Sequence, residues 1–372
     1  MNIGFEAKRI FQNRSGLGNY SRNTINLLSS YYPENKYILF APKVTDLYTI
    51  PDSAKIITPK SLFSQFFKSF WRLHQVAKLL SKNNVDIFHG LSHSLPYGIE
   101  KTGIVSVVTM HDLIFLRYPQ YYKKIDRNMY KSIYLSSCQR ATKIIAISNQ
   151  TKSDLINYFG IDPGKISVIY QSCDHRFYDR VSEEQKSSIR LKFKLPAKFI
   201  LSVGTIEQRK NQLSILRALA TGNIDTTLVI LGRPTEYIDQ LNKFILESGI
   251  QKKVIFLHDT TTDELQGIYQ MAEIMVYPSF FEGFGLPVLE AQASGCPVIT
   301  SNISSLPEAG GEGAFYINPA DILEISHAII NLLTDSKMRD SLIKKGNANA
   351  ELFSEKLVAE RLMNLYNGLK QS

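Results

Sequence analysis

The sequence predicts an α/β fold built from two doubly wound, Rossmann-like domains. Short apolar runs, typical of buried parallel strands, alternate with longer amphipathic segments along the chain. Three of these runs lead into a glycine-containing loop and then a helix, as in a βαβ unit. With 372 residues, the chain is also longer than one hydrophobic core usually needs. We therefore expect two domains with ligand sites at the carboxyl edges of their sheets.

The first domain is predicted over residues 1–178, and a polar, charged segment at 171–196 marks its end. Helices are expected from about Tyr20, over 123–140, and after a Ser148 cap. The apolar runs predict one strand ending near Phe5 and further strands at 37–41, 55–57, 85–89, 103–109, 143–147 and 166–170.

The second domain is predicted over residues 179–353, followed by an amphipathic helix at about 354–372. Helices are expected at 212–219 and 265–272, from about Pro287, and after Asp321. The predicted strands are 199–203, 228–231, 254–257, 274–277, 298–300 and 314–317.

Positive charge is concentrated in the first half. Residues 1–178 contain 23 Lys and Arg against 11 Asp and Glu, whereas the remainder contains 20 against 23. The basic residues are dispersed, and no RRM, zinc-finger or helix-turn-helix pattern accompanies them, so no nucleic-acid partner is predicted. An anionic membrane surface, or an acidic or phosphate-bearing acceptor, fits this charge better.

A segment rich in aromatic and basic residues lies at 61–80. Such a helix either lies in a membrane interface or packs on the sheet, and the sequence leaves both alternatives open. Its aromatic residues are Phe63, Phe66, Phe67, Phe70 and Trp71, beside Lys68, Arg72 and Lys78.

The sequence lacks the usual signals of export. No run of 18 apolar residues is present, so a transmembrane helix is not expected. The first residues have no basic segment followed by an apolar one. Cys138, Cys173 and Cys296 are too scattered for a disulfide framework or a metal site. We expect a cytoplasmic protein, with peripheral contact at the inner face of the cell membrane as a further expectation.

The stretch 279–290 is the predicted centre of the chemistry. It connects a strand to a helix, and the unpaired N–H groups at the start of a helix attract an anion. Gly283 and Gly285 allow the backbone a close approach to a ligand. Glu282 and Glu290 bracket the same hollow. Because carboxylates only accept hydrogen bonds, we assign one to a sugar hydroxyl and the other to a ribose hydroxyl, which predicts a nucleotide-sugar site.

A second motif follows the strand at 199–203. Gly204 begins a loop that contains Arg209 and Lys210 before the next helix. Arg offers a planar fork and Lys a point charge, so the pair is suited to neutralise a diphosphate. No Asp-x-Asp or His-rich triplet accompanies it, and we therefore predict no divalent metal and no other cofactor.

Two weaker motifs lie in the first domain. Gly16 and Gly18 belong to a loop between a strand and a helix, which suggests an anion site, although Gly-x-Gly alone is weak evidence. His111 and Asp112 follow the predicted strand 103–109 at the sheet edge. A core histidine bonded to a backbone carbonyl is the alternative for His111.

The stretch 279–290, with its E-x7-E pattern, and the G-x4-R-K-N pattern of 204–211 resemble the signatures of retaining glycosyltransferases of family four, in the GT-B superfamily. The resemblance covers nearly the whole chain. It implies two domains facing each other across a cleft, with the final helix crossing back onto the first domain. It also implies retention of the anomeric configuration.

The resemblance implies a role for each motif. Glu282 would contact the donor sugar's hydroxyls, Glu290 the ribose, and Arg209 with Lys210 the donor diphosphate. His111 would lie near the C6 hydroxyl of the sugar, and Asp112 would adjoin the acceptor. The remaining motif residues would line the donor site, and they are Gly16, Gly18, Gly204, Gly283, Phe284, Gly285 and Leu286.

The predicted activity is transfer of a hexose to a glycan or lipid-linked glycan in cell-surface polysaccharide or lipopolysaccharide synthesis. The 109–119 and 204–206 segments look most like mannosyltransferase-type members, which suggests mannose from GDP-mannose. A UDP-sugar donor is the first alternative. A nucleotide-sugar 2-epimerase and a catalytically silent sugar-binding subunit are the others.

Overall fold

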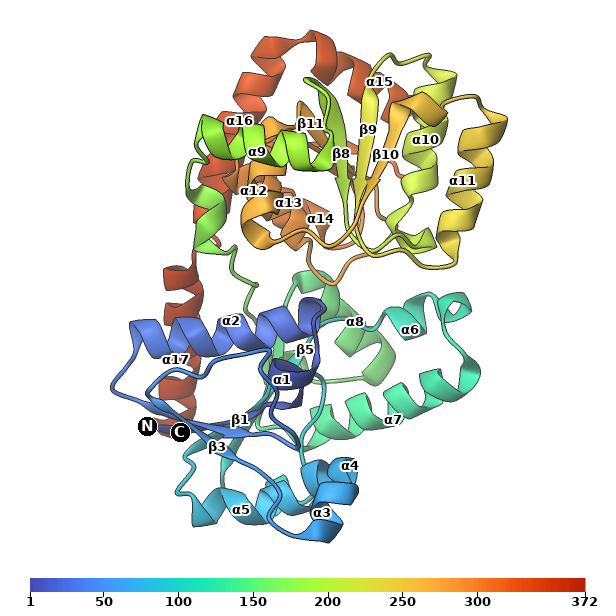
Figure 1. Cartoon of the computed structure of the whole chain (residues 1–372). Helices are drawn as coiled ribbons and strands as arrows, with labels where there is room; N and C mark the ends of the chain where they lie inside the picture. The colour runs from blue at the N-terminus through green and yellow to red at the C-terminus, as the bar shows by residue number, and fades with distance from the viewer. Residues whose placement is uncertain (372) are drawn as a thin grey trace. The chain divides into compact units, whose positions relative to one another are not determined.

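The computed structural model describes residues 1–371, apart from the side chains of Leu62 and Phe63, and its architecture is α/β as predicted (Figure 1). The chain forms two compact units. The N-terminal unit comprises Met1–Gln171 and the chain from Glu355 onward, and the C-terminal unit comprises Ser172–Ser354. The first division therefore lies slightly before residue 178, where the sequence places it.

The N-terminal unit is organised around seven parallel strands in the order β3-β2-β1-β4-β5-β6-β7. Most strands contribute side chains to both faces of the sheet: in β2, Tyr37 and Leu39 enter one core cluster, whereas Ile38 and Phe40 enter the other. Strands buried on both faces read as continuous apolar runs, which is why the sequence predicts them well. They are β1 (Asn2–Glu6), β2 (Lys36–Phe40), β3 (Ala54–Ile57), β4 (Ile87–Gly90), β5 (Val105–Met110), β6 (Lys143–Ala146) and β7 (Ile166–Val168).

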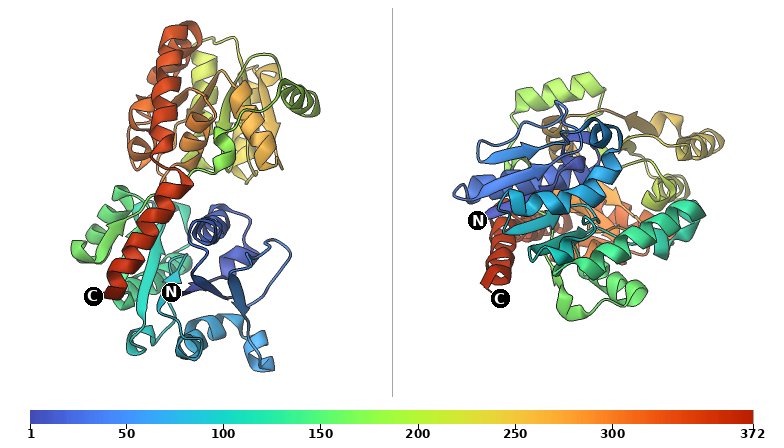
Figure 2. Two further views of the ribbon diagram at one scale, coloured as in Figure 1. Left: turned by 90° about the vertical axis from the view of Figure 1, so that its left-hand side faces the viewer. Right: turned by 90° about the horizontal axis from the view of Figure 1, so that it is seen from below.

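Helices cover both faces of this sheet (Figure 2). On one face α2 packs with α17, whose Leu362 and Tyr366 complete the core. On the other face Leu80 of α5, Cys138 of α7 and Leu155 of α8 form the second core. The helices are α1 (Lys8–Gln12), α2 (Gly16–Tyr31), α3 (Leu62–Phe66), α4 (Lys68–Phe70), the π-helix η1 (Trp71–Gln75), α5 (Val76–Lys82), α6 (Ile114–Arg117), α7 (Lys124–Arg140), α8 (Asn149–Phe159) and α17 (Glu355–Gln371).

The C-terminal unit contains six parallel strands in the order β10-β9-β8-β11-β12-β13. Ile200, Ile230 and Ile274 from three of these strands form its main core with side chains of α10, α11 and α15. The strands are β8 (Phe199–Val203), β9 (Thr227–Leu231), β10 (Val254–Leu257), β11 (Ile274–Tyr277), β12 (Val298–Ser301) and β13 (Ala314–Ile317).

Capping residues set the starts of several helices in this unit. The Thr261 hydroxyl accepts a hydrogen bond from Glu264 N at 3.2 Å, and Asp321 accepts one from Leu323 N at 2.9 Å. The helices are α9 (Glu183–Phe193), α10 (Gln212–Thr221), α11 (Tyr237–Glu247), α12 (Thr262–Met271), α13 (Leu286–Ala293), α14 (Leu306–Gly310), α15 (Ile322–Thr334) and α16 (Ser336–Glu351). None of the helices in the described residues is both long enough and apolar enough to cross a membrane.

The predicted strands are all present, with ends that differ by no more than two residues. The main error concerns the Gly16–Gly18 loop. Its two glycines lie in the first turn of α2, which begins at Gly16 and not near Tyr20. Helix α11 lies in a region where the sequence analysis places no helix.

The aromatic segment at 61–80 follows neither alternative over its whole length. Trp71, Val76 and Leu80 are buried in the core, whereas Phe66 and Phe67 are exposed. The side chain of Phe63 lies outside the described residues.

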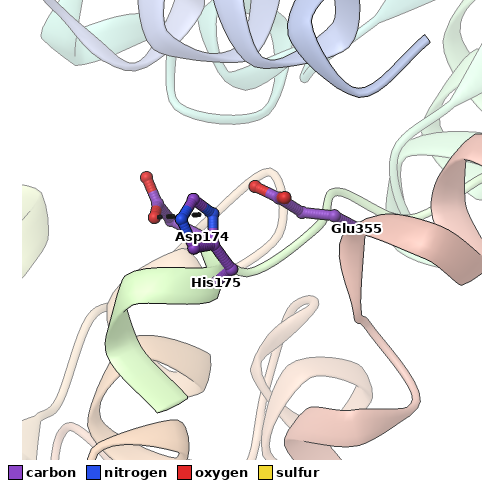
Figure 3. A group of neighbouring side chains, drawn as sticks. All are labelled: Asp174, His175 and Glu355. Carbon is purple, nitrogen blue, oxygen red and sulfur yellow. Dashed lines mark ion pairs between the residues drawn. The ribbon is translucent and has the colours of Figure 1, made fainter. Parts of the chain in front are cut away.

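The chain passes between the two units twice. After the first passage, the short helix η5 (His175–Tyr178) begins at Asp174, whose carboxylate accepts a hydrogen bond from Arg176 N at 3.0 Å. His175 Nδ1 lies 3.7 Å from Asp174 Oδ1, and Glu355 is the first residue of α17 after the second passage (Figure 3).

Both sheets reverse the direction of their strand order at one point. This point lies between β1 and β4 in the first sheet and between β8 and β11 in the second. Open parallel sheets bind ligands just beyond the carboxyl ends of the strands that flank such a point. The loops after β8 and β11 are therefore the first place to look for a site.

Candidate active site

The loops after β8 and β11 lie against each other in the C-terminal unit. Phe280 N donates to the carbonyl oxygen of Arg209 at 2.9 Å, and Asn211 Nδ2 donates to that of Pro278 at 3.1 Å. Asn211 adopts a left-handed backbone conformation with φ of 59°, which places its side chain in this buried position. Two motifs that are far apart in the sequence therefore form one surface.

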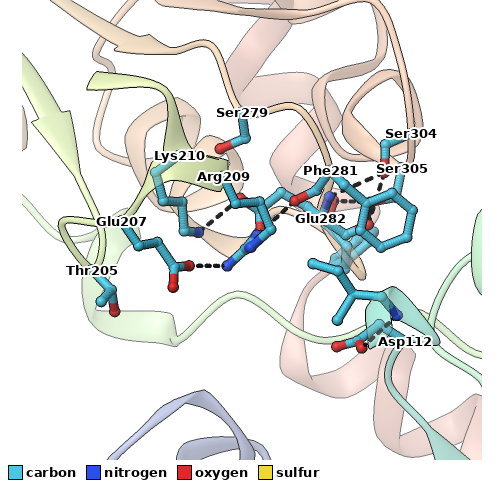
Figure 4. A network of polar contacts seen from close by, with 12 residues as sticks. Asp112, Thr205, Glu207, Arg209, Lys210, Ser279, Phe281, Glu282, Ser304 and Ser305 are labelled. Carbon is cyan, nitrogen blue, oxygen red and sulfur yellow. Dashed lines mark hydrogen bonds and ion pairs between the residues drawn. The ribbon is translucent and has the colours of Figure 1, made fainter. Parts of the chain in front are cut away.

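Glu282 lies between Arg209 and Lys210 (Figure 4). Its Oε2 is 2.7 Å from Arg209 Nη1, and its Oε1 is 2.7 Å from Lys210 Nζ. Tyr277, the last residue of β11, donates its hydroxyl to the same Oε1 at 3.0 Å. Glu207 pairs with the other end of the guanidinium, with 2.5 Å between Glu207 Oε1 and Arg209 Nη2. The formal charges of these two cations and two carboxylates sum to zero.

The cations keep Glu282 ionised. Burial opposes its charge, but Arg209 and Lys210 outweigh burial and lower the pKa of Glu282 to about 2. Burial lowers the pKa of Lys210, against the opposing effect of Glu282. Burial also raises the pKa of Tyr277, and the Glu282 charge adds to this effect, so the phenol keeps its proton as a hydrogen-bond donor. Glu282 thus presents an ionised, acceptor-only group at neutral pH.

Two serines hold the backbone of Glu282. Glu282 N donates to Ser304 Oγ at 3.1 Å, and Ser304 Oγ lies 2.9 Å from the Glu282 carbonyl oxygen. Ser305 Oγ lies 2.8 Å from that oxygen and 2.7 Å from the carbonyl oxygen of Phe284. Hydrogen bonds with Ser304 and Ser305 therefore fix the backbone of the loop that carries Glu282. A precisely positioned side chain requires such support.

Glu290 lies on α13, apart from the Arg209–Lys210 pair. Its Oε2 accepts a hydrogen bond from Tyr269 OH at 3.1 Å. Burial raises the pKa of Glu290 to about 7 against the opposing effect of the Tyr269 hydrogen bond. The charge of Asp174 also raises it, and that of Lys210 lowers it. The two glutamates of the E-x7-E pattern thus have opposite electrostatics: Glu282 is ionised by its cations, whereas Glu290 exchanges its proton near neutral pH.

The glycines of the two loops allow close contacts. Gly204 has φ of 130° and lies beside Lys210, whose Cε would be 3.4 Å from an added Cβ. Gly285 has φ of 132°, and an added Cβ would be 3.1 Å from both Ala309 and Leu306. Phe284 is buried with its ring 5.5 Å from that of Phe353, while Gly283 and Leu286 are half-buried beside it at the start of α13.

In the N-terminal unit, Gly18 has a clear packing role. A Cβ on Gly18 would lie 1.9 Å from the carbonyl oxygen of Asn13, whereas nothing lies within 4 Å of a Cβ on Gly16. Asn13 in turn accepts a hydrogen bond from Ser15 N at 2.7 Å. The structure thus explains Gly18 by the tight approach of the preceding loop, and it supplies no such reason for Gly16.

His111 follows β5 and is buried. Its Nε2 lies 2.9 Å from the Leu91 carbonyl oxygen, which is the contact of a satisfied core histidine, and its Nδ1 lies 3.4 Å from Gln171 Nε2. Burial lowers the pKa of His111 to about 4, so the ring is neutral. Asp112 Oδ1 accepts a hydrogen bond from Ile114 N at 3.1 Å, at the start of α6.

The sequence analysis missed the polar residues that support these groups. Tyr277 and Tyr269 act on the two glutamates, but in the sequence they are ordinary residues of a strand and a helix. Glu207 stands two positions before Arg209 and forms an ion pair with it. An acidic residue so close to a predicted diphosphate site was the one feature of the sequence that could have indicated this pair.

Two descriptions of known protein families match most of the chain. Residues 183–349 match the family described as "Glycosyl transferases group 1", and residues 34–177 match "Glycosyltransferase Family 4". Over 287 residues the chain is 31% identical to O-antigen chain mannosyltransferase B of Escherichia coli, which covers 75% of this chain and 74% of that protein. It is 29% identical over 264 residues to O-antigen chain mannosyltransferase RfbU of Salmonella typhimurium, covering 71% and 69%.

The fold also matches solved structures. Anabaena HepE, crystallised with UDP and glucose, superposes with a TM-score of 0.78 at 17% identity, covering 99% of this chain and 100% of that one. At this identity the likeness concerns the fold alone, which is the GT-B arrangement of two Rossmann-like domains.

Proposed function

We propose a donor and a reaction for this chain, which belongs to the group 1 glycosyltransferases. The chain transfers mannose from GDP-mannose to a growing glycan in the synthesis of O-antigen or a similar cell-surface polysaccharide. The anomeric configuration of mannose is retained, and no metal takes part. The names of the two enterobacterial relatives support mannose as the sugar.

The observation that carries this proposal is the contact of Arg209 and Lys210 with Glu282 at the carboxyl ends of β8 and β11. In the reaction, the bond between the anomeric carbon and the diphosphate oxygen breaks, and negative charge grows on the diphosphate. Two fixed cations stabilise that charge without reorganising at the moment of reaction. The acceptor hydroxyl forms the new glycosidic bond, and its proton passes to the departing diphosphate.

The donor enters a site in which the cations are already paired. Because both cations already contact carboxylates, a diphosphate competes with Glu207 and Glu282 for Arg209 and Lys210. Glu207 is the more exposed of the two carboxylates and is the easier to displace. Glu282 then accepts a hydrogen bond from a sugar hydroxyl while it keeps contact with one cation. This exchange orients the sugar at the same time as it binds the phosphates.

The donor is tested by thermal unfolding with GDP-mannose, a UDP-hexose and a dTDP-hexose at equal concentrations. A ligand that binds only the folded state raises the midpoint, and we expect the largest increase with GDP-mannose. UDP-sugars are the second candidate, because HepE of the same fold was solved with UDP and glucose. Equal increases with all three ligands would contradict the assignment of the base.

Transfer itself is tested with GDP-mannose and a lipid-linked glycan. We expect mannose in the product with the α configuration of the donor, and the β product would contradict retention. Activity that is lost in EDTA and restored by magnesium or manganese would contradict metal independence. Release of an epimerised sugar without acceptor would indicate the 2-epimerase, and binding without turnover would indicate the silent subunit.

The acceptor is proposed to be carried on a lipid, which would place the enzyme against the membrane. The excess of basic residues in the first half supports this. The cytoplasmic location expected from the sequence remains part of the proposal, and cell fractionation tests it.

A further inference from the structure

A pocket of about 440 Å³ lies at the carboxyl ends of β2 and β3 in the N-terminal unit. Two lysines line it, Lys43 from the segment after β2 and Lys68 from α4. Thr58, Gln65 and Phe66 line it as well, together with two prolines, and none of the lining residues is acidic. Ammonium groups, a hydroxyl and an amide are donors that suit a phosphate oxygen.

Phe66, the last residue of α3, is the aromatic residue that lines this pocket, and Phe67 and Phe70 follow it in the chain at the start and end of the short α4 segment. Figure 1 shows α3 and α4 next to each other. Phe66 is 83% exposed, Phe67 56% and Phe70 43%. Trp71, the residue after Phe70, is instead only 2% exposed and fixes the segment to the core. Consecutive exposed aromatic residues beside a pocket form an apolar patch, and such a patch marks a contact surface.

The segment that carries the patch has charge of one sign. Residues 53–85 contain six Lys and Arg and no Asp or Glu. Arg72 points inward and donates to Ser94 Oγ at 2.7 Å, but Lys55, Lys60, Lys68 and Lys78 are exposed. A segment whose charged residues are all basic is complementary to an anionic partner.

We propose that this face binds the surface of an anionic phospholipid bilayer. Lys43 and Lys68 contact a headgroup phosphate in the pocket, while Phe66, Phe67 and Phe70 enter the interface. A water-soluble anion would satisfy the lysines but leave the phenyl rings in water. An apolar protein surface would cover the rings but not match the charge. An anionic lipid satisfies both, and it is the occupant to which the geometry points.

The test uses the full chain and vesicles of phosphatidylcholine, with or without phosphatidylglycerol. We expect flotation only with the anionic vesicles, and weaker binding at high salt. Lys43→Glu with Lys68→Glu, and separately Phe66→Ser with Phe67→Ser, should each reduce binding roughly tenfold or more. The matched control is Ile125→Ser with Met129→Ser, two exposed apolar residues on α7 of the same unit, and it should bind as the wild type does.

Several outcomes overturn the proposal. They are equal binding to neutral vesicles, loss of binding in the α7 control alone, wild-type binding in both pocket variants, and displacement from vesicles by millimolar inorganic phosphate. The last would mean that the pocket holds a free phosphate. The substituted side chains are exposed, so unchanged thermal midpoints will show that the variants are folded.

Only the role of this bilayer contact rests on the proposed function. That role is to hold the enzyme where a lipid-linked acceptor lies. Vesicle binding is measured without donor or acceptor. Failure of binding therefore leaves the donor assignment standing, and failure of transfer leaves the bilayer contact standing.

Discussion

Glu282 forms ion pairs with both cations that are proposed to bind the donor diphosphate. Its carboxylate is buried and pairs with two cations, and removing one partner of such a buried pair leaves an uncompensated charge. Glu282 therefore holds Arg209 and Lys210 in place, and a diphosphate that binds these cations competes with its carboxylate. A substitution at Glu282 should separate binding of the nucleotide from transfer of the sugar.

The variant Glu282→Gln keeps the shape of the side chain and removes its charge. We expect kcat to fall at least about a hundredfold, because the sugar loses an acceptor that orients it. Affinity for GDP should stay equal or increase, since Glu282 no longer competes with the diphosphate for Arg209 and Lys210. Steady-state kinetics and calorimetric titration with GDP measure the two quantities. A parallel loss of both would show that Glu282 serves only to hold the cations.

Glu290 should make donor binding depend on pH. With a pKa near 7 in the folded protein, it gains its charge as the pH rises from 6 to 8. The ionised carboxylate is the stronger acceptor for a ribose hydroxyl, so GDP affinity should increase over this range. Glu290→Gln should bind GDP more weakly at pH 8 and should lose this pH dependence. Titrations of both proteins with GDP at several pH values provide the measurement.

The carboxyl group of Glu290 should also make the free energy of unfolding depend on pH. Its pKa is raised above that of an unfolded glutamate, so the folded state binds the extra proton, and the free energy of unfolding falls as the pH rises toward 7. Denaturant unfolding of the wild type should show this loss relative to Glu290→Gln. A difference between the two proteins that stays constant from pH 5 to 8 would contradict the raised pKa.

At the scale of the element, the start of α2 provides a matched pair of glycines. Gly18→Ala would place a Cβ against the carbonyl oxygen of Asn13, so the loop has to move. We expect a cost of roughly 1–3 kcal/mol in the free energy of unfolding, typical of overpacking. Gly16→Ala meets no atom and should be neutral or slightly stabilising, because alanine favours a helix. Denaturant unfolding of both variants measures the difference, and equal effects would contradict the packing role of Gly18.

The elements that the sequence predicts best are the strands. Each is a short apolar run because both faces of its sheet are covered, and this signal is local. The start of α2 and the whole of α11 are less well predicted, because their boundaries depend on contacts such as that of Gly18 with Asn13. Local patterns do not report such contacts.

The candidate site was also predicted in its local features but not in its contacts between distant segments. The residue types of Arg209, Lys210 and Glu282 indicate their chemistry, and their positions after strands indicate the sheet edge. Their mutual ion pairs depend on β8 lying next to β11, although β9 and β10 come between them in the chain. Strand order of this kind is not encoded in any one segment, which is why the pairing could not be predicted from the motifs.

At the scale of the whole molecule, the two units differ in how the chain builds them. The C-terminal unit is one continuous stretch, Ser172–Ser354, which contains its core and the Arg209–Lys210–Glu282 cluster. The N-terminal unit needs α17, from the other end of the chain, to complete its core. Tyr366 of α17 contributes a buried hydroxyl 2.6 Å from His89 Nδ1 as well as apolar surface.

A chain that ends at Ser354 should therefore affect the two units differently. We expect the N-terminal unit to lose its cooperative unfolding, because five buried side chains of α17 are missing, whereas GDP binding is retained and transfer is lost. The milder variant Tyr366→Phe should cost about 1–3 kcal/mol by leaving His89 Nδ1 without its buried partner. Tyr158→Phe, at an exposed tyrosine, is the control and should be neutral. Calorimetric unfolding and GDP titration measure these effects.

The placement of α17 also sets an order for folding during synthesis. The strands of the N-terminal unit leave the ribosome before the C-terminal unit, but α17, which completes the cover of one face of their sheet, is translated only after that unit. At a translation rate of 5–20 residues per second, this face waits roughly 10–40 s for its cover. The C-terminal unit folds within that interval. Apolar surface on this face of the N-terminal sheet is therefore available to a chaperone until α17 has been translated.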